Sequence, residues 1–248
     1  MKKYLISLLV GCCLAVSAGN TFIPDMKFRR LDTRDGLSNS TINYLFQDSK
    51  GYVWIGTSYG LNRYDGYRFR TFYSDPNDTT TLRNNYVDQI WEDVEGNLWL
   101  KQGMNFSVFD PVTEKVTRNP AALLRKWGVK SGIDRFFIDS QKRIWVKSYD
   151  EGLYCFHPKT KTMTLIKYGY GENEFPKEFW VQSFAEWSGK LLITSSDGDL
   201  MCVDGNKGKV LWKDTYMREN GGQPSQAYYI YVDKHSNFWV LSTTVFVF

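Results

Sequence analysis

Five carboxylate residues recur at regular spacing along the chain, and carboxylates can act as general acids and bases in catalysis. Each lies six residues before a tryptophan or, once, a leucine, and successive carboxylates are 45, 46, 47 and 47 residues apart. They are Asp48, Asp93, Asp139, Glu186 and Asp233. A residue that returns in every repeat is expected to serve the repeat itself. We therefore predict that these carboxylates accept backbone N–H groups in hairpin turns.

Two cysteines beyond the first 18 residues and two histidines could bind metal or act as nucleophiles. Cys155 and Cys202 hold equivalent places in neighbouring repeats, so we expect about 10 Å between them. A disulfide needs Cα atoms within about 7 Å, and both thiols are therefore predicted to be free and buried. His157 and His235 have no second ligand at metal-binding spacing. The sequence predicts no catalytic residue, no metal and no cofactor.

The repeat that positions these residues has an aromatic residue, an acid two places on and a tryptophan six places later. In the first copy, Phe46, Asp48 and Trp54 join two strand-like runs, Ile42–Gln47 and Tyr52–Thr57. Two more runs follow, Leu61–Tyr64 and Tyr67–Tyr73. The acid and tryptophan anchors of later copies are Asp93 and Trp99, Asp139 and Trp145, and Asp233 and Trp239. The fourth copy departs most, with Phe184, Glu186 and Leu192.

Four short antiparallel strands in units of about 45 residues predict an all-β fold, a β-propeller of four-stranded blades. Neighbouring blades cover both faces of each blade, which accounts for an aromatic content of 17%. About five blades fit the chain, and we expect an open, incomplete N-terminal part of a seven-bladed propeller. Met26–Leu31 resembles a fourth strand that closes the last blade, and closure onto the fifth copy would give a five-bladed ring. Only Ala121–Lys126 is expected to form a helical turn.

The predicted domain organisation has three parts. Residues 1–18 form a signal peptide, residues 19–31 form an N-terminal segment with the ring-closing strand, and residues 32–248 form the blades. The expected blade boundaries are approximately 32–73, 74–118, 119–168, 169–214 and 215–248.

The first 18 residues have the three parts of a secretory signal, so we expect an exported protein on the periplasmic side of the inner membrane. Lys2 and Lys3 precede an apolar run from Tyr4 to Ala18, which is shorter than the ~20 residues of a membrane span. We predict cleavage after Ala18. One alternative is a lipoprotein anchored through Cys12, although the residues after Cys12 are apolar. The other is an uncleaved anchor.

The variable parts of the repeats are the loops between copies and the loops between second and third strands. We expect both sets to open on one face of the propeller, and variable loops on a rigid scaffold often carry function. The ligand-binding candidates on this face are Asn39, Tyr59, Arg83, Asn84 and Tyr149. Aromatic rings there could stack on sugar rings, while arginine and asparagine could supply hydrogen bonds.

Overall charge argues against a nucleic-acid partner. The net charge is +4, and without Lys2 and Lys3 there are 29 basic against 27 acidic residues. This balance is too close to neutral for a nucleic-acid or anionic-membrane surface. A small-molecule ligand is the partner that we expect.

The first copy resembles the two-component regulator propeller repeat. The resemblance rests on Asp35-Gly36-Leu37-Ser38-Asn39, on Phe46 to Thr57, and on Gly60-Leu61-Asn62-Arg63-Tyr64-Asp65-Gly66. It covers nearly all of residues 26–248 and is strong in the first copy, good in the second and third, and weak in the fourth. The resemblance implies the extracytoplasmic sensor region of Bacteroides-type hybrid two-component histidine kinases, in which seven-bladed propellers precede a membrane helix and kinase modules.

The resemblance implies a role in signal transduction and phosphorelay. We expect this chain to be a non-enzymatic, ligand-sensing propeller, with an oligosaccharide from glycan breakdown as its ligand and polysaccharide utilisation as its output. Its further partners would be downstream propeller and kinase modules of a longer protein, with a homodimer in that context. The alternatives are a secreted glycosidase or lyase and a periplasmic protein-interaction scaffold.

Overall fold

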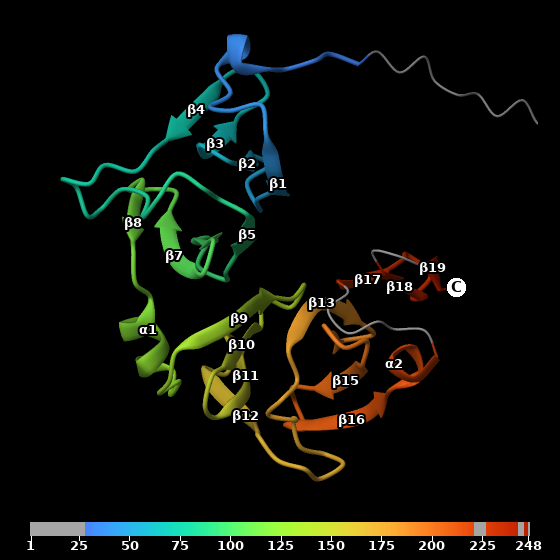
Figure 1. Cartoon of the computed structure of the whole chain (residues 1–248). Coiled ribbons are helices and arrows are strands. Elements are labelled where there is room, and N and C mark those ends of the chain that lie inside the picture. Colours follow the sequence, from blue (N-terminus) through green and yellow to red (C-terminus); the bar gives the residue numbers. More distant parts are fainter. Residues whose placement is uncertain (1–27, 221–226, 243–245, 248) are drawn as a thin grey trace, which may run out of the picture. The chain divides into compact units, whose positions relative to one another are not determined.

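The computed structural model describes residues 28–220, 227–242 and 246–247. It divides the chain into two units, residues 1–31 and 32–248. The second unit is an all-β propeller of four antiparallel four-stranded blades, followed by a fifth sheet of three strands (Figure 1). In each four-stranded blade the strands pair in chain order, as the repeat predicts.

The strands have the following bounds. Blade 1 comprises β1 (Ile42–Gln47), β2 (Val53–Thr57), β3 (Gly60–Tyr64) and β4 (Phe69–Phe72). Blade 2 comprises β5 (Gln89–Glu92), β6 (Leu98–Gln102), β7 (Asn105–Asp110) and β8 (Lys115–Thr117). Blade 3 comprises β9 (Ile133–Ile138), β10 (Ile144–Ser148), β11 (Gly152–His157) and β12 (Thr162–Lys167). Blade 4 comprises β13 (Val181–Trp187), β14 (Lys190–Ser195), β15 (Leu200–Asp204) and β16 (Lys209–Asp214). The fifth sheet comprises β17 (Tyr228–Val232), β18 (Phe238–Ser242) and β19 (Phe246–Val247).

In the residues that the structure describes, three short helices lie outside the sheets. The helix predicted at Ala121–Lys126 is present as α1. A 3-10 turn, η1 (Thr33–Asp35), and α2 (Tyr216–Asn220) were not predicted. Five residues make little more than one helical turn, so α2 leaves too short an apolar pattern for sequence periodicity to detect.

The recurring aspartate explains the six-residue spacing of the repeat. In blade 1, Oδ1 of Asp48 accepts the backbone N–H groups of Lys50 and Tyr52, both at 2.9 Å. The other carboxylate oxygen accepts the indole N–H of Trp54 at 2.7 Å. One carboxylate therefore closes the turn and also fixes the core tryptophan of the next strand.

The same pairing recurs in three later copies. The indole N–H to carboxylate distances are 3.1 Å for Trp99 and Asp93, 2.9 Å for Trp145 and Asp139, and 3.3 Å for Trp239 and Asp233. These carboxylates are occupied by hairpin and indole donors, as expected for groups that build the blade.

The fourth copy corrects the alignment made from spacing. Glu186 does not close its own hairpin, because Ser188 and Gly189 form a tight two-residue turn with φ values of 48° and 72°. Glu186 instead accepts the backbone and side-chain donors of Ser140 in blade 3, at 2.7 and 2.9 Å. Its counterpart in blade 2 is Glu92, which accepts hydrogen bonds from the backbone N–H and the hydroxyl of Ser49 in blade 1.

Aromatic residues fill the interfaces between blades. Trp54 meets Phe109 of blade 2 with ring centroids 5.4 Å apart, and Trp99 stacks on Phe136 of blade 3 at 4.4 Å. Trp145 lies against Gly205 of blade 4, where an added Cβ would come within 2.6 Å of the indole. These three tryptophans are fully buried, whereas Trp239 in the fifth sheet is 41% exposed.

The predicted ring-closing strand, Met26–Leu31, falls partly outside the described residues. Met26 and Lys27 lie there, and the four described residues, 28–31, form no strand. Closure of the propeller by this segment stays a prediction.

Candidate functional site

A cavity of about 390 Å³ lies where the first strands of the blades come together. We call it the inner-strand cavity. Each of the five sheets contributes a side chain from its first strand, and β6 and β7 add the turn around Gly103 and Met104. Concave sites with a few polar groups among apolar walls are typical ligand sites.

Two ion pairs brace one side of the inner-strand cavity. Lys101 on β6 donates to Asp88 at 2.5 Å, and Lys147 on β10 donates to Asp134 at 2.5 Å. Both pairs join residues 13 positions apart in the chain, in equivalent places of blades 2 and 3. The Lys147 side chain is only 5% exposed, so the pair holds Asp134 in a fixed orientation at the cavity wall.

Arg135 extends this network into the cavity. Its guanidinium donates to the Asp134 carboxylate at 3.0 Å and to the Val181 carbonyl of blade 4 at 3.0 Å. The second contact joins two blades at the cavity wall. Arg135 is partly exposed there, so it can offer further donors to a ligand.

Two amide side chains and several rings complete the wall. Gln89 and Gln182 line the cavity and form no side-chain hydrogen bond with another residue that the structure describes. Both amides are available to a polar ligand. Tyr44 is partly buried, and this burial raises the pKa of its hydroxyl. Tyr229 is 51% exposed and presents a ring from the fifth sheet.

These residues were missed by the sequence analysis, although the sequence carries a signal for them. Asp88 and Lys101 return as Asp134 and Lys147 after 46 residues. Each lysine directly follows three apolar residues at the start of its strand. Lys101 follows Leu98–Leu100, and Lys147 follows Ile144–Val146. A charged residue in a strand buried on both faces needs a partner, and this rule could have identified both pairs.

A second cavity, of about 430 Å³, lies among the loops between blades 2 and 3. We call it the loop cavity. The predicted candidate Arg83 lines it. Asn84 follows Arg83 but uses its carbonyl to accept Gln102 at 2.5 Å and its side chain to accept the N–H of Tyr86 at 2.9 Å. Tyr149 lies beside Gly132, which is also part of the cavity wall.

The other two candidates lie in blade 1. The Asn39 side chain accepts the N–H of Thr41 at 2.8 Å, which is a local turn contact. Tyr59 is 56% exposed, and its ring centroid is 5.9 Å from that of Tyr73. The five predicted residues therefore do not form one site, and only Arg83, Asn84 and Tyr149 gather near a cavity.

The two sets of loops do lie together, as expected. The N–H groups of Ser58, Tyr149 and Ser196, after the second strands, donate to Thr41, Gly132 and Trp180, before the first strands. These backbone bonds place both loop sets of blades 1, 3 and 4 at the same end of their sheets.

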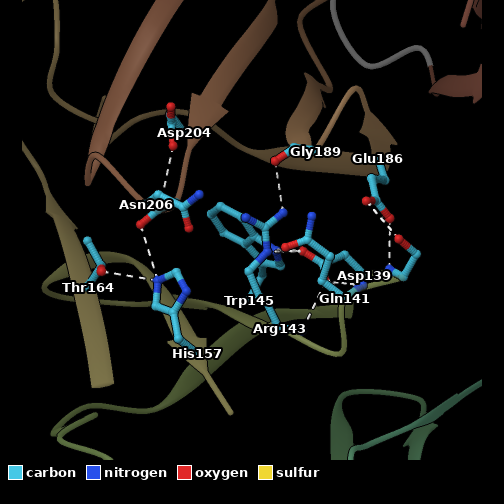
Figure 2. Close-up of polar contacts among 12 residues, drawn as sticks. Asp139, Gln141, Arg143, Trp145, His157, Thr164, Glu186, Gly189, Asp204 and Asn206 are labelled. Carbon is cyan, nitrogen blue, oxygen red and sulfur yellow. Dashed lines mark hydrogen bonds and ion pairs between the residues drawn. The ribbon is translucent and has the colours of Figure 1, made fainter. Parts of the chain in front are cut away.

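The blade 3–blade 4 junction holds the candidate His157 and a buried ion pair (Figure 2). Arg143 donates to Asp139 at 2.6 Å and to the Gly189 carbonyl of blade 4 at 3.0 Å. His157 lies within hydrogen-bond distance of Thr164 and of the Gly205 carbonyl, at 3.2 and 3.3 Å. This histidine therefore has a structural role between blades.

Cys155 and Cys202 are free and buried, which confirms the prediction. Burial raises the pKa of Cys155 to about 12 and that of Cys202 to about 11. Both thiols are therefore protonated at neutral pH and unsuited to act as nucleophiles. Within the described ranges, no three His, Cys, Asp or Glu side chains gather as a metal-binding group.

Part of the chain is similar to a curated protein. Among curated proteins, a histidine kinase named P4 from Formosa agariphila is 38% identical over 55 residues. This alignment covers 22% of the present chain and 4% of that protein.

Two solved structures are similar over most of the chain. One is the extracellular domain of the putative one component system BT4673 from B. thetaiotaomicron, with 16% identity, a TM-score of 0.49, and coverage of 89% of this chain and 36% of that one. The other is PorZ, a component of the type-IX secretion system of Porphyromonas gingivalis, with 15% identity, a TM-score of 0.46, and coverage of 81% and 31%. With TM-scores below 0.5 at this identity, neither says what this chain binds.

None of the helices in the described ranges is long and apolar enough to cross a bilayer. Residues 36–59 match the family model described as "Two component regulator propeller". This segment runs from Gly36, through the first hairpin, to the turn after β2, and it includes most of the residues on which the resemblance rested. The match confirms the resemblance over residues 36–59, within the first copy of the repeat.

Proposed function

We propose that this chain is the ligand-sensing propeller of a longer two-component signalling protein. The observation that carries the proposal is the match of residues 36–59 to the two component regulator propeller family. The similarity to a histidine kinase over 55 residues supports the same assignment. In this function the chain binds a ligand, while kinase modules elsewhere in the longer protein transfer phosphate.

The same proposal places the chain outside the cytoplasm. Residues 1–18 would be removed as a signal peptide, with a lipid anchor at Cys12 as the alternative, and the mature chain would act on the periplasmic side of the inner membrane. These residues lie outside the described part of the chain, so the sequence pattern alone supports this step. N-terminal sequencing of the exported protein would show which residue begins the mature chain.

The ligand that we propose is a small oligosaccharide bound in the inner-strand cavity. A sugar presents many hydroxyl groups around an apolar ring face. The cavity offers matching groups, because Gln89, Gln182 and Arg135 can form hydrogen bonds and Tyr229 can stack on a ring. The Asp–Lys pairs keep the polar wall rigid, which lowers the entropic cost of binding.

Calorimetric titration of the chain with a panel of neutral and acidic tetrasaccharides tests ligand sensing. We expect Gln182→Ala and Tyr229→Ala each to weaken binding about tenfold, since each removes a direct contact. Tyr170→Ala is the matched control, because Tyr170 is 90% exposed and lies outside both cavities. Unchanged affinity in both cavity variants would move the ligand out of the inner-strand cavity.

Two further measurements test the class of protein. The gene sequence beyond Phe248 should continue into a membrane helix and kinase modules. Incubation of the chain with the same saccharides should give no product. Turnover would replace the sensor by the glycosidase or lyase alternative.

A further inference from the structure

Three basic residues from three segments line the loop cavity. Arg83 comes from the loop before β5, Arg125 from α1, and Lys130 from the loop before β9. No aspartate or glutamate lines this cavity. The wall therefore carries positive charge only.

The three cations lack the carboxylate partner that several lysines of the blades have. Lys101, Lys142 and Lys147 each pair with a carboxylate. In the described part of the chain, Arg83, Arg125 and Lys130 form no ion pair. The guanidinium of Arg83 makes only a long contact of 3.4 Å to the carbonyl of Arg118. Its charge is thus not compensated locally.

One carboxylate faces the cavity from outside its wall. Glu151 accepts the backbone N–H of Lys130 at 3.2 Å and the hydroxyl of Tyr154 at 2.6 Å. Its charge offsets one of the three cations in part. The cavity keeps a net positive charge with two arginine forks, whose geometry suits bidentate recognition of a carboxylate or sulfate group.

The rest of the wall mixes polar and apolar residues. Asn105, Asn119 and Ser131 add polar groups, while Phe106, Leu124 and Val129 are its buried apolar members. Phe106 and Met104 line both the loop cavity and the inner-strand cavity. The two cavities therefore adjoin at Met104, which is 78% exposed.

We infer that the loop cavity binds the acidic group of an acidic oligosaccharide, a uronate carboxylate or a sulfate ester, while the remaining rings lie in the inner-strand cavity. This inference rests on the proposed function and narrows its ligand class. Arg83 and Arg125 hold the anionic group, Lys130 adds attraction, and the apolar floor contacts the sugar ring.

Calorimetric titration with three tetrasaccharides tests the inference. The probes are tetragalacturonate, a chondroitin sulfate tetrasaccharide and neutral cellotetraose, each at low and high NaCl concentration. We expect an acidic probe to bind more tightly than cellotetraose and to lose affinity as salt rises. Arg83→Gln, Arg125→Gln and Lys130→Gln should each weaken that binding by about three- to tenfold.

Arg68→Gln and Lys159→Gln are matched controls, because both residues are exposed and lie outside the two cavities. Tetragalacturonate and the chondroitin sulfate probe distinguish a carboxylate from a sulfate ligand. Equal binding of cellotetraose, with no effect of the three glutamine variants, would overturn the acidic ligand and leave the sensor function standing. Absence of binding by all three probes would overturn both.

Discussion

At the scale of single residues, four of the five copies carry an aspartate that closes the hairpin turn and also binds the indole of the repeat tryptophan, and its surroundings decide how much stability depends on it. Asp48 holds two backbone N–H groups and an indole. Asp139 holds the same kinds of donor and also the buried guanidinium of Arg143, whose side chain is 3% exposed. The repeat thus contains a carboxylate whose loss would leave a charge buried without its partner.

We therefore predict that Asp139→Ala destabilises the protein more than Asp48→Ala. Removal of one partner from a buried ion pair costs about 3–5 kcal/mol, whereas loss of a neutral hydrogen-bond acceptor costs about 1–3 kcal/mol. Guanidinium denaturation of both variants measures the difference. Adding Arg143→Met to Asp139→Ala should recover stability, and a further loss would contradict this account.

The two free cysteines give a second prediction at this scale. Burial raises the pKa of Cys155 to about 12 and of Cys202 to about 11. Because iodoacetamide attacks the thiolate, labelling of the native chain at mildly alkaline pH should be at least about a hundredfold slower than in denaturant, where the pKa is about 8.5. Mass spectrometry of the two peptides follows each residue separately. Similar rates in both states would show that the thiols are accessible.

At the scale of elements, the hairpins of successive blades are joined by glutamates. Glu92 at the end of β5 accepts the N–H and hydroxyl of Ser49 at 3.1 and 2.8 Å. It also accepts Lys142 of blade 3 at 2.6 Å. Burial alone would raise the pKa of Glu92, but Lys142 and Ser49 outweigh it and the pKa is lowered.

This lowered pKa predicts a pH-dependent effect of Glu92→Gln. The wild type gains stability from Glu92 above the ordinary glutamate pKa of about 4.3, and loses it as pH falls through the lowered folded-state pKa. At neutral pH the variant should therefore be about 1–2 kcal/mol less stable, and the difference should vanish in acid. Thermal unfolding across this pH range measures it. Glu95→Gln, an exposed residue of the same hairpin, should show no such pH dependence.

At the scale of the whole molecule, equivalent tryptophans of different sheets differ in how deeply they are buried. Trp99 is fully buried between blades 2 and 3, whereas the equivalent Trp239 is 41% exposed on the fifth sheet. Both indoles donate to the aspartate of their own hairpin. The two positions therefore share the hydrogen bond and differ in burial alone.

We predict that Trp99→Leu costs about 3–5 kcal/mol, the range for loss of a large buried side chain, and that Trp239→Leu costs about 1 kcal/mol or less. Differential scanning calorimetry of the two variants checks this. Equal losses would mean that something covers Trp239 in solution, and size-exclusion chromatography with light scattering would show whether a second copy does so.

The sequence predicted the blades because their anchors return four or five times with nearly constant spacing. It failed at Glu186, where a two-residue turn shortens the hairpin and shifts the alignment. It also missed the inner-strand cavity, because Asp88 and Lys101 return only once, as Asp134 and Lys147. Arg83 could be assigned to a loop face, but its convergence with Arg125 and Lys130 depends on how two blades pack, which no local pattern encodes.

The position of Glu92 affects whether the blades unfold one at a time or together. Blades that touched only through apolar faces could separate one at a time. Glu92 belongs to blade 2 but is held by blade 1 and blade 3, so the departure of either neighbour leaves a buried carboxylate short of donors. The first three hairpins should therefore exchange their amide protons together, as one cooperative unit.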